Sequence, residues 1–153
     1  MKRFIIFLMS IIILSSCGGK SNKREIAENF LEGYKMNNLE AMTKNIPKED
    51  KNKVYNIDMA ELKPQEQSLI TNLNNELNWE FIKEDKESAT FKIIKKDLDA
   101  ITANKSFKMN EIPTKEEEIS FKYNDKNEII NIEEIFHSIS SWGDKIWKII
   151  IKY

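Results

Sequence analysis

Residues 78–94 have the sequence NWEFIKEDKESATFKII, and the alternation within this stretch decides the fold. With a period of two residues, one predicted face of the stretch carries the apolar residues Trp79, Phe81, Ala89, Phe91 and Ile93. Alternation over runs of this length is typical of strands that bury one face. A charged run at 84–87 separates the two halves. The stretch therefore predicts two strands joined by a turn.

The same period continues toward the C-terminus. A third strand is predicted where Ile119, Phe121 and Tyr123 alternate, and it is followed by a turn with the sequence Asn-Asp-Lys-Asn at 124–127. A fourth strand is predicted to open at Ile130 and Ile132 and to run as far as Ile139. After a turn at 142–145, residues 146–153 alternate again and predict a final strand.

Upstream of residue 78 the apolar period is helical. A first helix is predicted from Lys23, a short second one from Leu39 that ends before Pro47, and a third one from Pro64. The first has its apolar stripe at Ile26, Ala27, Phe30, Leu31 and Tyr34, and the third has its stripe at Leu69, Ile70, Leu73 and Leu77. Residues 48–53 are charged and predict a loop. Helices followed by an antiparallel meander indicate an α+β domain with the helices on one face of the sheet.

The N-terminus has the features of an export signal. Lys2 and Arg3 precede an apolar run at 4–14, which is too short for a membrane-spanning helix of roughly 20 residues. Small residues follow at Ser15 and Ser16, and the only cysteine of the chain, Cys17, comes next.

The order Leu14-Ser15-Ser16-Cys17 resembles the lipobox of bacterial lipoproteins. The resemblance implies cleavage between Ser16 and Cys17, a diacylglyceryl group on the Cys17 sulfur and an acyl chain on the new amino group. It also implies a membrane partner and a location in the cell envelope, at the outer membrane if the cell has one. The alternative is an ordinary secretory signal with an incidental cysteine.

This resemblance divides the chain into three parts. Residues 1–16 are predicted to be the signal peptide, 17–22 a flexible lipidated tether, and 23–153 a single α+β domain. Removing 1–16 takes away Lys2 and Arg3 and no acid, so the formal charge falls from −1 to −3. A charge so near neutral gives no electrostatic case for nucleic acid as a partner. A lipidated Cys17 leaves no thiol for disulfides, thiolate metal sites or a cysteine nucleophile.

Candidate site residues are few. The possible lining of an apolar pocket is Trp79, Phe91, Phe121, His137 and Trp147. His137 is the only histidine and the natural acid–base group of such a pocket. The alternative interpretation is that His137 is a surface residue and that the aromatic residues fill the core. Carboxylate pairs occur at Asp97/Asp99, Glu116/Glu118 and Glu133/Glu134, and we interpret them as solvated charge. We find no known catalytic motif, and the sequence predicts no catalytic residue, metal or cofactor.

Two further stretches, FLEGYKMNNLEAM at 30–42 and WGDKIWKI at 142–149, resemble the NTF2-like, cystatin-like superfamily. The resemblance implies a curved antiparallel sheet of about four to six strands wrapped around a helix, sometimes with an apolar pocket at its wide end. The family includes isomerases and dehydratases as well as members without known catalysis.

These observations favour a lipid-anchored, non-catalytic protein that binds another envelope protein or a small apolar ligand. One alternative is an NTF2-like enzyme with a small apolar substrate and His137 as its acid–base group. Another is a surface lipoprotein that contacts extracellular or host molecules.

Overall fold

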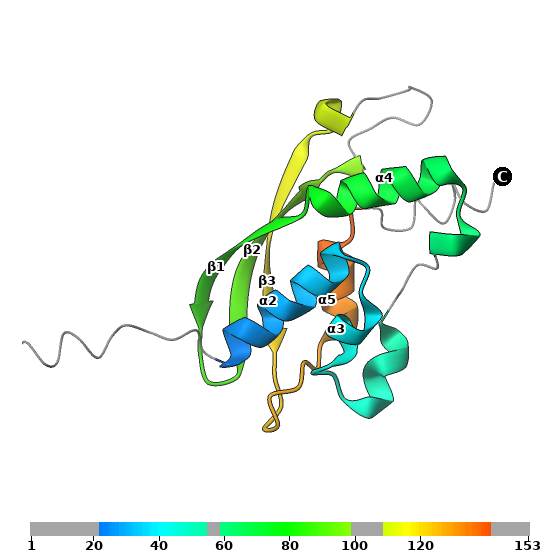
Figure 1. The fold of residues 1–153 in the computed structure, drawn as a ribbon. Helices are drawn as coiled ribbons and strands as arrows, with labels where there is room; N and C mark the ends of the chain where they lie inside the picture. Colours follow the sequence, from blue (N-terminus) through cyan, green and yellow to red (C-terminus); the bar gives the residue numbers. More distant parts are fainter. Residues whose placement is uncertain (1–21, 55–58, 99–108, 142–153) are drawn as a thin grey trace, which may run out of the picture.

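A computed structural model describes residues 22–54, 59–98 and 109–141 of the chain (Figure 1). In chain order the elements are α2 (Asn22–Lys35), α3 (Leu39–Thr43), the 3-10 helices η2 (Lys48–Lys53) and η3 (Met59–Glu61), α4 (Pro64–Asn75), β1 (Asn78–Glu84), β2 (Ser88–Lys96), the 3-10 helix η5 (Met109–Glu111), β3 (Thr114–Lys122) and α5 (Ile132–Ile139). The fold is α+β, as the sequence predicts.

The sheet described here has three antiparallel strands in the order β1-β2-β3. The predicted hairpin at 78–94 is confirmed, and its turn is held by Asp85, whose Oδ1 accepts hydrogen bonds from the main-chain N–H groups of Glu87 and Ser88 at 2.9 and 2.8 Å. In β1 the register shifts between Phe81 and Lys83, so Ile82 is an extra residue in a bulge. The predicted turn at 124–127 is also confirmed, and Asn127 adopts a positive φ of 58° there.

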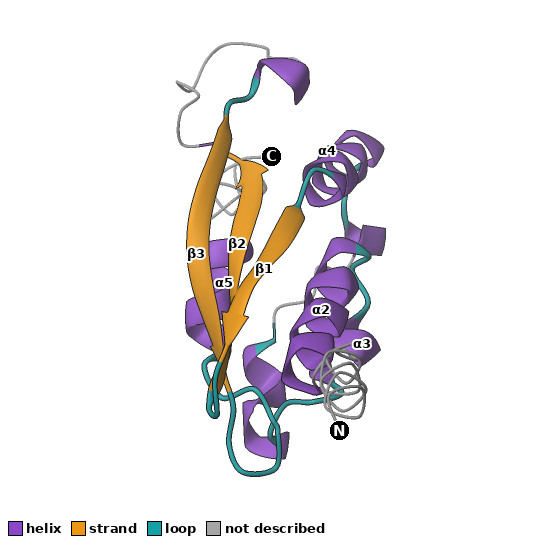
Figure 2. Ribbon diagram, turned by 90° about the vertical axis from the view of Figure 1, so that its left-hand side faces the viewer, coloured by secondary structure: helices purple, strands orange, loops and turns teal. Residues whose placement is uncertain are grey.

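The inner face of the sheet carries the core. Helix α2 packs on it through Phe30, whose ring makes edge contacts with Phe121 of β3 and Phe136 of α5 at centroid distances of 5.8 and 5.7 Å. The rings of Phe91 and Phe121 are in edge contact at 5.7 Å. Figure 2 shows α2, α3 and α4 to one side of the sheet. Helices α2 and α5 therefore cover the same face, the one that the alternation assigned to the core.

The predicted N-terminal helices are confirmed. Helix α2 meets α3 closely because Gly33 has no side chain: a Cβ there would lie 2.9 Å from the Cβ of Ala41. Helix α4 has Pro64 at its first position, where the missing N–H costs nothing. The Glu66 carboxylate accepts a hydrogen bond from the Lys63 N–H at 2.8 Å, which satisfies one donor at the helix start.

The predicted fourth strand is wrong: residues 132–139 form α5 instead. The buried apolar residues of this segment are Ile132, Ile135, Phe136 and Ile139. Their spacing of i, i+3, i+4 and i+7 is the helical period, and it outweighs the alternation that Ile130 and Ile132 suggest. Glu133 and Glu134 lie in the first turn, where the helix dipole favours acids.

Two smaller expectations also change. Residues 48–53, predicted as a loop, form the 3-10 helix η2. Among the described residues the sheet has three strands and is not curled, where the resemblance implied a curved sheet of about four to six strands. The predicted final strand at 146–153 lies outside the described residues.

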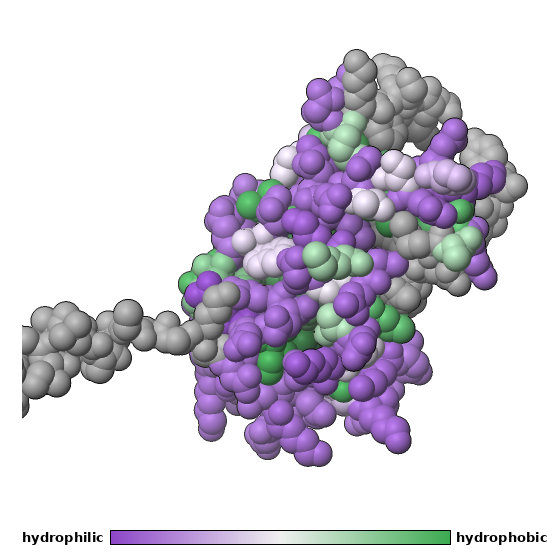
Figure 3. Space-filling model, in the orientation of Figure 1, coloured by the Kyte–Doolittle hydropathy of each residue, from purple (hydrophilic) through white to green (hydrophobic). Residues whose placement is uncertain are grey.

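The outer face of the sheet is polar. Lys92 of β2 lies between Glu80 of β1 and Glu116 of β3, with Nζ–Oε2 distances of 2.9 and 3.7 Å. Thr90 and Ser120 share a hydrogen bond of 2.8 Å on the same face. Polar side chains of this kind are expected on the solvent-exposed face of an antiparallel sheet whose other face packs on the core. The face of the molecule that carries α2 and α4 is also mostly hydrophilic, with apolar side chains in small separate patches (Figure 3).

Candidate functional site

The predicted aromatic pocket residues divide between core and rim. Phe91 and Phe121 are fully buried, and Phe91 also contacts Phe81 at 5.5 Å. Trp79 is half-buried at the edge of this cluster, and the Nζ of Lys35 lies 5.8 Å from the centroid of its ring. These three therefore fill the inner layer of the fold. Trp147 lies outside the described residues.

His137 is not brought together with the aromatic cluster. It lies on the exposed side of α5, while its neighbours Phe136 and Ser138 are buried. The enzyme alternative requires His137 and a carboxylate to converge in a cavity, whereas in the described part of the chain His137 faces outward from α5.

Three acids of the predicted carboxylate pairs lie at the surface with basic partners. Glu116 pairs with Lys92, Glu133 with Lys53 and Glu134 with Lys122. Asp99 lies outside the described residues. The interpretation of these acids as surface charge fits the placement of Glu116, Glu133 and Glu134.

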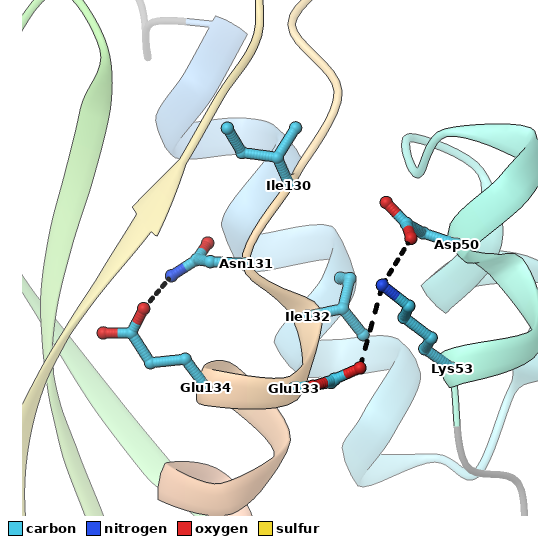
Figure 4. Close-up of a pocket in the computed structure, with 7 residues that line it drawn as sticks. All are labelled: Asp50, Lys53, Ile130, Asn131, Ile132, Glu133 and Glu134. Carbon is cyan, nitrogen blue, oxygen red and sulfur yellow. Dashed lines mark hydrogen bonds and ion pairs between the residues drawn. The ribbon is translucent and has the colours of Figure 1, made fainter.

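An open depression of about 270 Å³ lies where η2 faces the start of α5 (Figure 4). Its lining is Asp50, Lys53, Ile130, Asn131, Ile132, Glu133 and Glu134. The charges within it are paired: the Nζ of Lys53 lies 2.7 Å from Asp50 Oδ1 and 3.7 Å from Glu133 Oε1. The hydrogen bond and charge of Asp50 raise the pKa of Lys53, so this lysine stays protonated.

Asn131 joins the depression to the sheet. Its Nδ2 donates to the Ser120 carbonyl at 2.8 Å and to Glu134 Oε2 at 3.0 Å, and its Oδ1 accepts from the Lys122 N–H at 2.9 Å. The hydrogen bonds from Asn131 and Lys122 lower the pKa of Glu134. The polar groups here are engaged with one another, so the depression is a structural junction between β3 and α5.

A second polar cluster, which sequence reasoning missed, lies at the other end of α5. Lys95 is only 6% exposed, and its Nζ donates to the main-chain carbonyls of Ser138 and Ser140 and lies 3.6 Å from Glu117 Oε2. The Ser138 hydroxyl donates to Glu117 Oε1 at 2.9 Å. Burial lowers the pKa of Lys95, and the charge of Glu117 opposes that shift. We call Lys95, Glu117, Ser138 and Ser140 the α5 end cluster.

The α5 end cluster anchors the helix. A cation at the last carbonyls of a helix satisfies acceptors that have no intrahelical partner and matches the helix dipole. The signal for it was present in the sequence, because Lys95 continues the inner-face series of Ala89, Phe91 and Ile93. A lysine at a core position of a strand needs a buried partner.

Across the described residues, no three histidine, cysteine, aspartate or glutamate side chains are grouped so as to hold a metal ion. None of the described helices combines the length and apolar character needed to cross a membrane. Comparisons with protein-family models, curated proteins and solved structures found no match to this chain.

Proposed function

We propose that this chain is a lipid-anchored bacterial lipoprotein whose α+β domain acts as a non-catalytic binding module in the cell envelope. The observation that carries the proposal is the sequence Leu14-Ser15-Ser16-Cys17 directly after a basic n-region and a short apolar run. Two or three acyl chains on Cys17 would hold the protein stably at a membrane, because each buried methylene contributes about 0.8 kcal/mol.

Three placements support the non-catalytic part of the proposal. His137 is exposed on α5, Phe91 and Phe121 pack in the core, and the charges in the depression at η2 are paired among themselves. A catalytic centre needs polar groups that converge on a substrate, often with perturbed pKa values. Here Asp50 of the same 3-10 helix raises the pKa of Lys53, and hydrogen bonds from Asn131 and Lys122 lower the pKa of Glu134, so both shifts come from paired neighbouring side chains.

The edge of β1 supports the binding part. Within the described sheet β1 pairs only with β2, so its other edge has main-chain groups that an extended segment could pair with. Arg24 lies over the Phe81 ring at 4.5 Å, and Ile82 is 42% exposed. The bulge at Ile82 limits pairing to part of the strand, and this favours a specific partner over unspecific association of edges.

We also propose that the domain is related to the NTF2-like, cystatin-like superfamily. The order of helices followed by meander strands supports this, as does the close approach of α2 and α3 at Gly33, within the matching stretch at 30–42. We further propose that residues 146–153 form an additional strand of the sheet. The helix at 132–139 and the uncurled sheet are departures that this relation must accommodate.

The lipid anchor is tested by metabolic labelling with an alkyne fatty acid in the bacterium that expresses the full chain. The wild-type protein should incorporate the probe and have the mass of residues 17–153 plus lipid. Cys17→Ala should lose the probe and keep its signal peptide, while the matched control Ser15→Ala should behave as the wild type. Labelling of Cys17→Ala equal to that of the wild type would refute the proposal.

A further inference from the structure

The position of α2 within the fold limits how the anchored domain can face the membrane. Asn22 is the first residue of α2, and it follows Cys17 by five residues. A chain of five residues spans at most about 18 Å, whatever its conformation. If Cys17 is lipidated, the start of α2 is therefore held within about 18 Å of the level at which the lipid enters the bilayer.

The start of α2 lies at one end of the sheet. The hydroxyl of Tyr123 donates to the Lys23 carbonyl at 2.7 Å, and the Tyr123 N–H donates to the Glu87 carbonyl at 2.9 Å. These contacts join the first turn of α2 to the turns at 84–88 and 124–127. We call these three segments the anchor end (Figures 1 and 2).

The opposite end is formed by η5 and by the pairing of Lys96 with Thr114. Strand β2 runs between the two ends from Ser88 to Lys96. At about 3.3 Å per residue, its nine residues separate the ends by roughly 26 Å. This separation exceeds the reach of the tether.

From the tether length and the position of α2, we propose that the anchor end faces the bilayer that holds the lipid and that η5 points away from it. The inference rests on the proposed lipid anchor. Basic and acidic side chains are mixed at the anchor end, for example at Glu84, Asp85, Lys86 and Glu87. Such a mixture provides little net attraction to anionic headgroups, so the tether and not surface charge keeps this end near the membrane.

The charges on the outer face of the sheet do not favour a flat orientation. The acids Glu80, Glu116 and Glu118 share this face with the lysines Lys83, Lys92 and Lys122, and Lys92 pairs with Glu80 and Glu116. A domain that lay on this face would gain little from anionic headgroups, because its acidic and basic side chains are mixed.

The test uses the lipidated full-length protein in vesicles that contain a phospholipid with a nitroxide headgroup, a short-range quencher of fluorescence. Lys86→Cys places a fluorophore at the anchor end, and Asn110→Cys places one on η5; both positions are exposed. The chain has one native cysteine, so with Cys17 lipidated the introduced thiol is the only one that reacts with a maleimide dye. Unchanged urea midpoints relative to the unlabelled protein confirm that the variants are folded.

We expect the label at position 86 to be quenched at least threefold more strongly than the label at position 110. Inserting about ten Gly-Ser residues after Gly19 should reduce the quenching at position 86, because the mean span of a flexible tether grows with the square root of its length. Equal quenching at both positions, or stronger quenching at 110, would overturn the inference. Sedimentation with the vesicles separates the two proposals: if Cys17→Ala sediments as fully as the wild type, the lipid anchor itself is refuted.

Discussion

Tyr34 offers a quantitative test of the packing between α2 and α5. Its side chain is buried at 8% exposure, its ring contacts Phe136 at 5.8 Å, and it has a side-chain hydrogen bond to Ser140. Burial raises the pKa of its phenol from 10.0 to about 12, although the hydrogen bond to Ser140 opposes the shift. The folded state therefore keeps its proton at a pH at which the unfolded chain has lost it.

The sign of the effect follows from this difference. Below pH 10 the tyrosine is neutral in both states and adds no pH dependence. As pH rises from 10.0 toward about 12, the unfolded state is stabilised by ionisation and the folded state is not, so stability falls. The loss from this one residue is about 1.4 kcal/mol at pH 11 and about 2.7 kcal/mol once both states are ionised.

The perturbation is Tyr34→Phe, which keeps the ring and removes the ionisable group. Urea unfolding of the wild type and the variant at about pH 8 gives the neutral difference, which we expect to be about 1 kcal/mol for the lost hydrogen bond. At about pH 11 the wild type should have lost about 1.4 kcal/mol more than the variant. The lysines lose their protons at alkaline pH in both proteins, so their effect on stability cancels when the unfolding free energy of the variant is subtracted from that of the wild type.

A constant difference between about pH 8 and pH 11 would refute this reasoning, because it would mean that Tyr34 ionises at an ordinary pKa in the folded protein. Absorbance titration of tyrosinate is an independent check. In the folded wild type the buried phenols of Tyr34 and Tyr123 should both titrate later than they do in urea, and Tyr34→Phe should lose one of these two late components.

Three further substitutions test the packing and the hydrogen bonds by urea unfolding. Phe91→Ala should cost about 3–5 kcal/mol because the residue is fully buried, while Ile82→Ala, its exposed control in the neighbouring strand, should change stability by less than about 1 kcal/mol. Gly33→Ala should lower the free energy of unfolding by about 1–2 kcal/mol despite the better helix propensity of alanine, because the new Cβ would lie 2.9 Å from the Cβ of Ala41. Adding Ala41→Gly should recover part of this loss. If the double variant is as unstable as Gly33→Ala, the clash with Ala41 is not the cause. Asn131→Ala should cost about 2–3 kcal/mol through its three hydrogen bonds, and a cost below about 0.5 kcal/mol would show that water replaces them.

The parts of the fold that could be predicted from the sequence are those in which a single period persists. The stripe from Ile26 to Tyr34 predicts α2, and the alternation from Trp79 to Ile93 predicts the hairpin, because in each case the same spacing recurs over several residues. The segment from Ile130 to Ile139 begins with two alternating isoleucines before its helical spacing becomes evident. Short apolar runs of this kind fit both periods, so the surrounding structure decides between them.

The candidate site was harder to predict because residue type does not distinguish a core from a pocket. Lys95 illustrates the limit: its place in the inner-face series follows from the alternation, but its partners come from α5, 43 and 45 residues further along the chain. Long-range contacts of this kind depend on which elements meet, and the strand expected at 130–139 would not have offered helix-terminal carbonyls to a lysine. The missed cluster and the wrong strand therefore have one cause.

The same cause explains why the aromatic residues form core and not a pocket. A strand at 130–139 would have left the inner face of the sheet without α5. Instead α5 crosses the inner face and brings Phe136 against Phe30, which in turn contacts Phe121. This chain of edge contacts packs Phe121 into the core at the inner face. With Phe91, Phe121 and Phe136 packed in this way, we expect the proposed module to bind a partner at outer surfaces of the described residues, such as the β1 edge or the end that points away from the membrane.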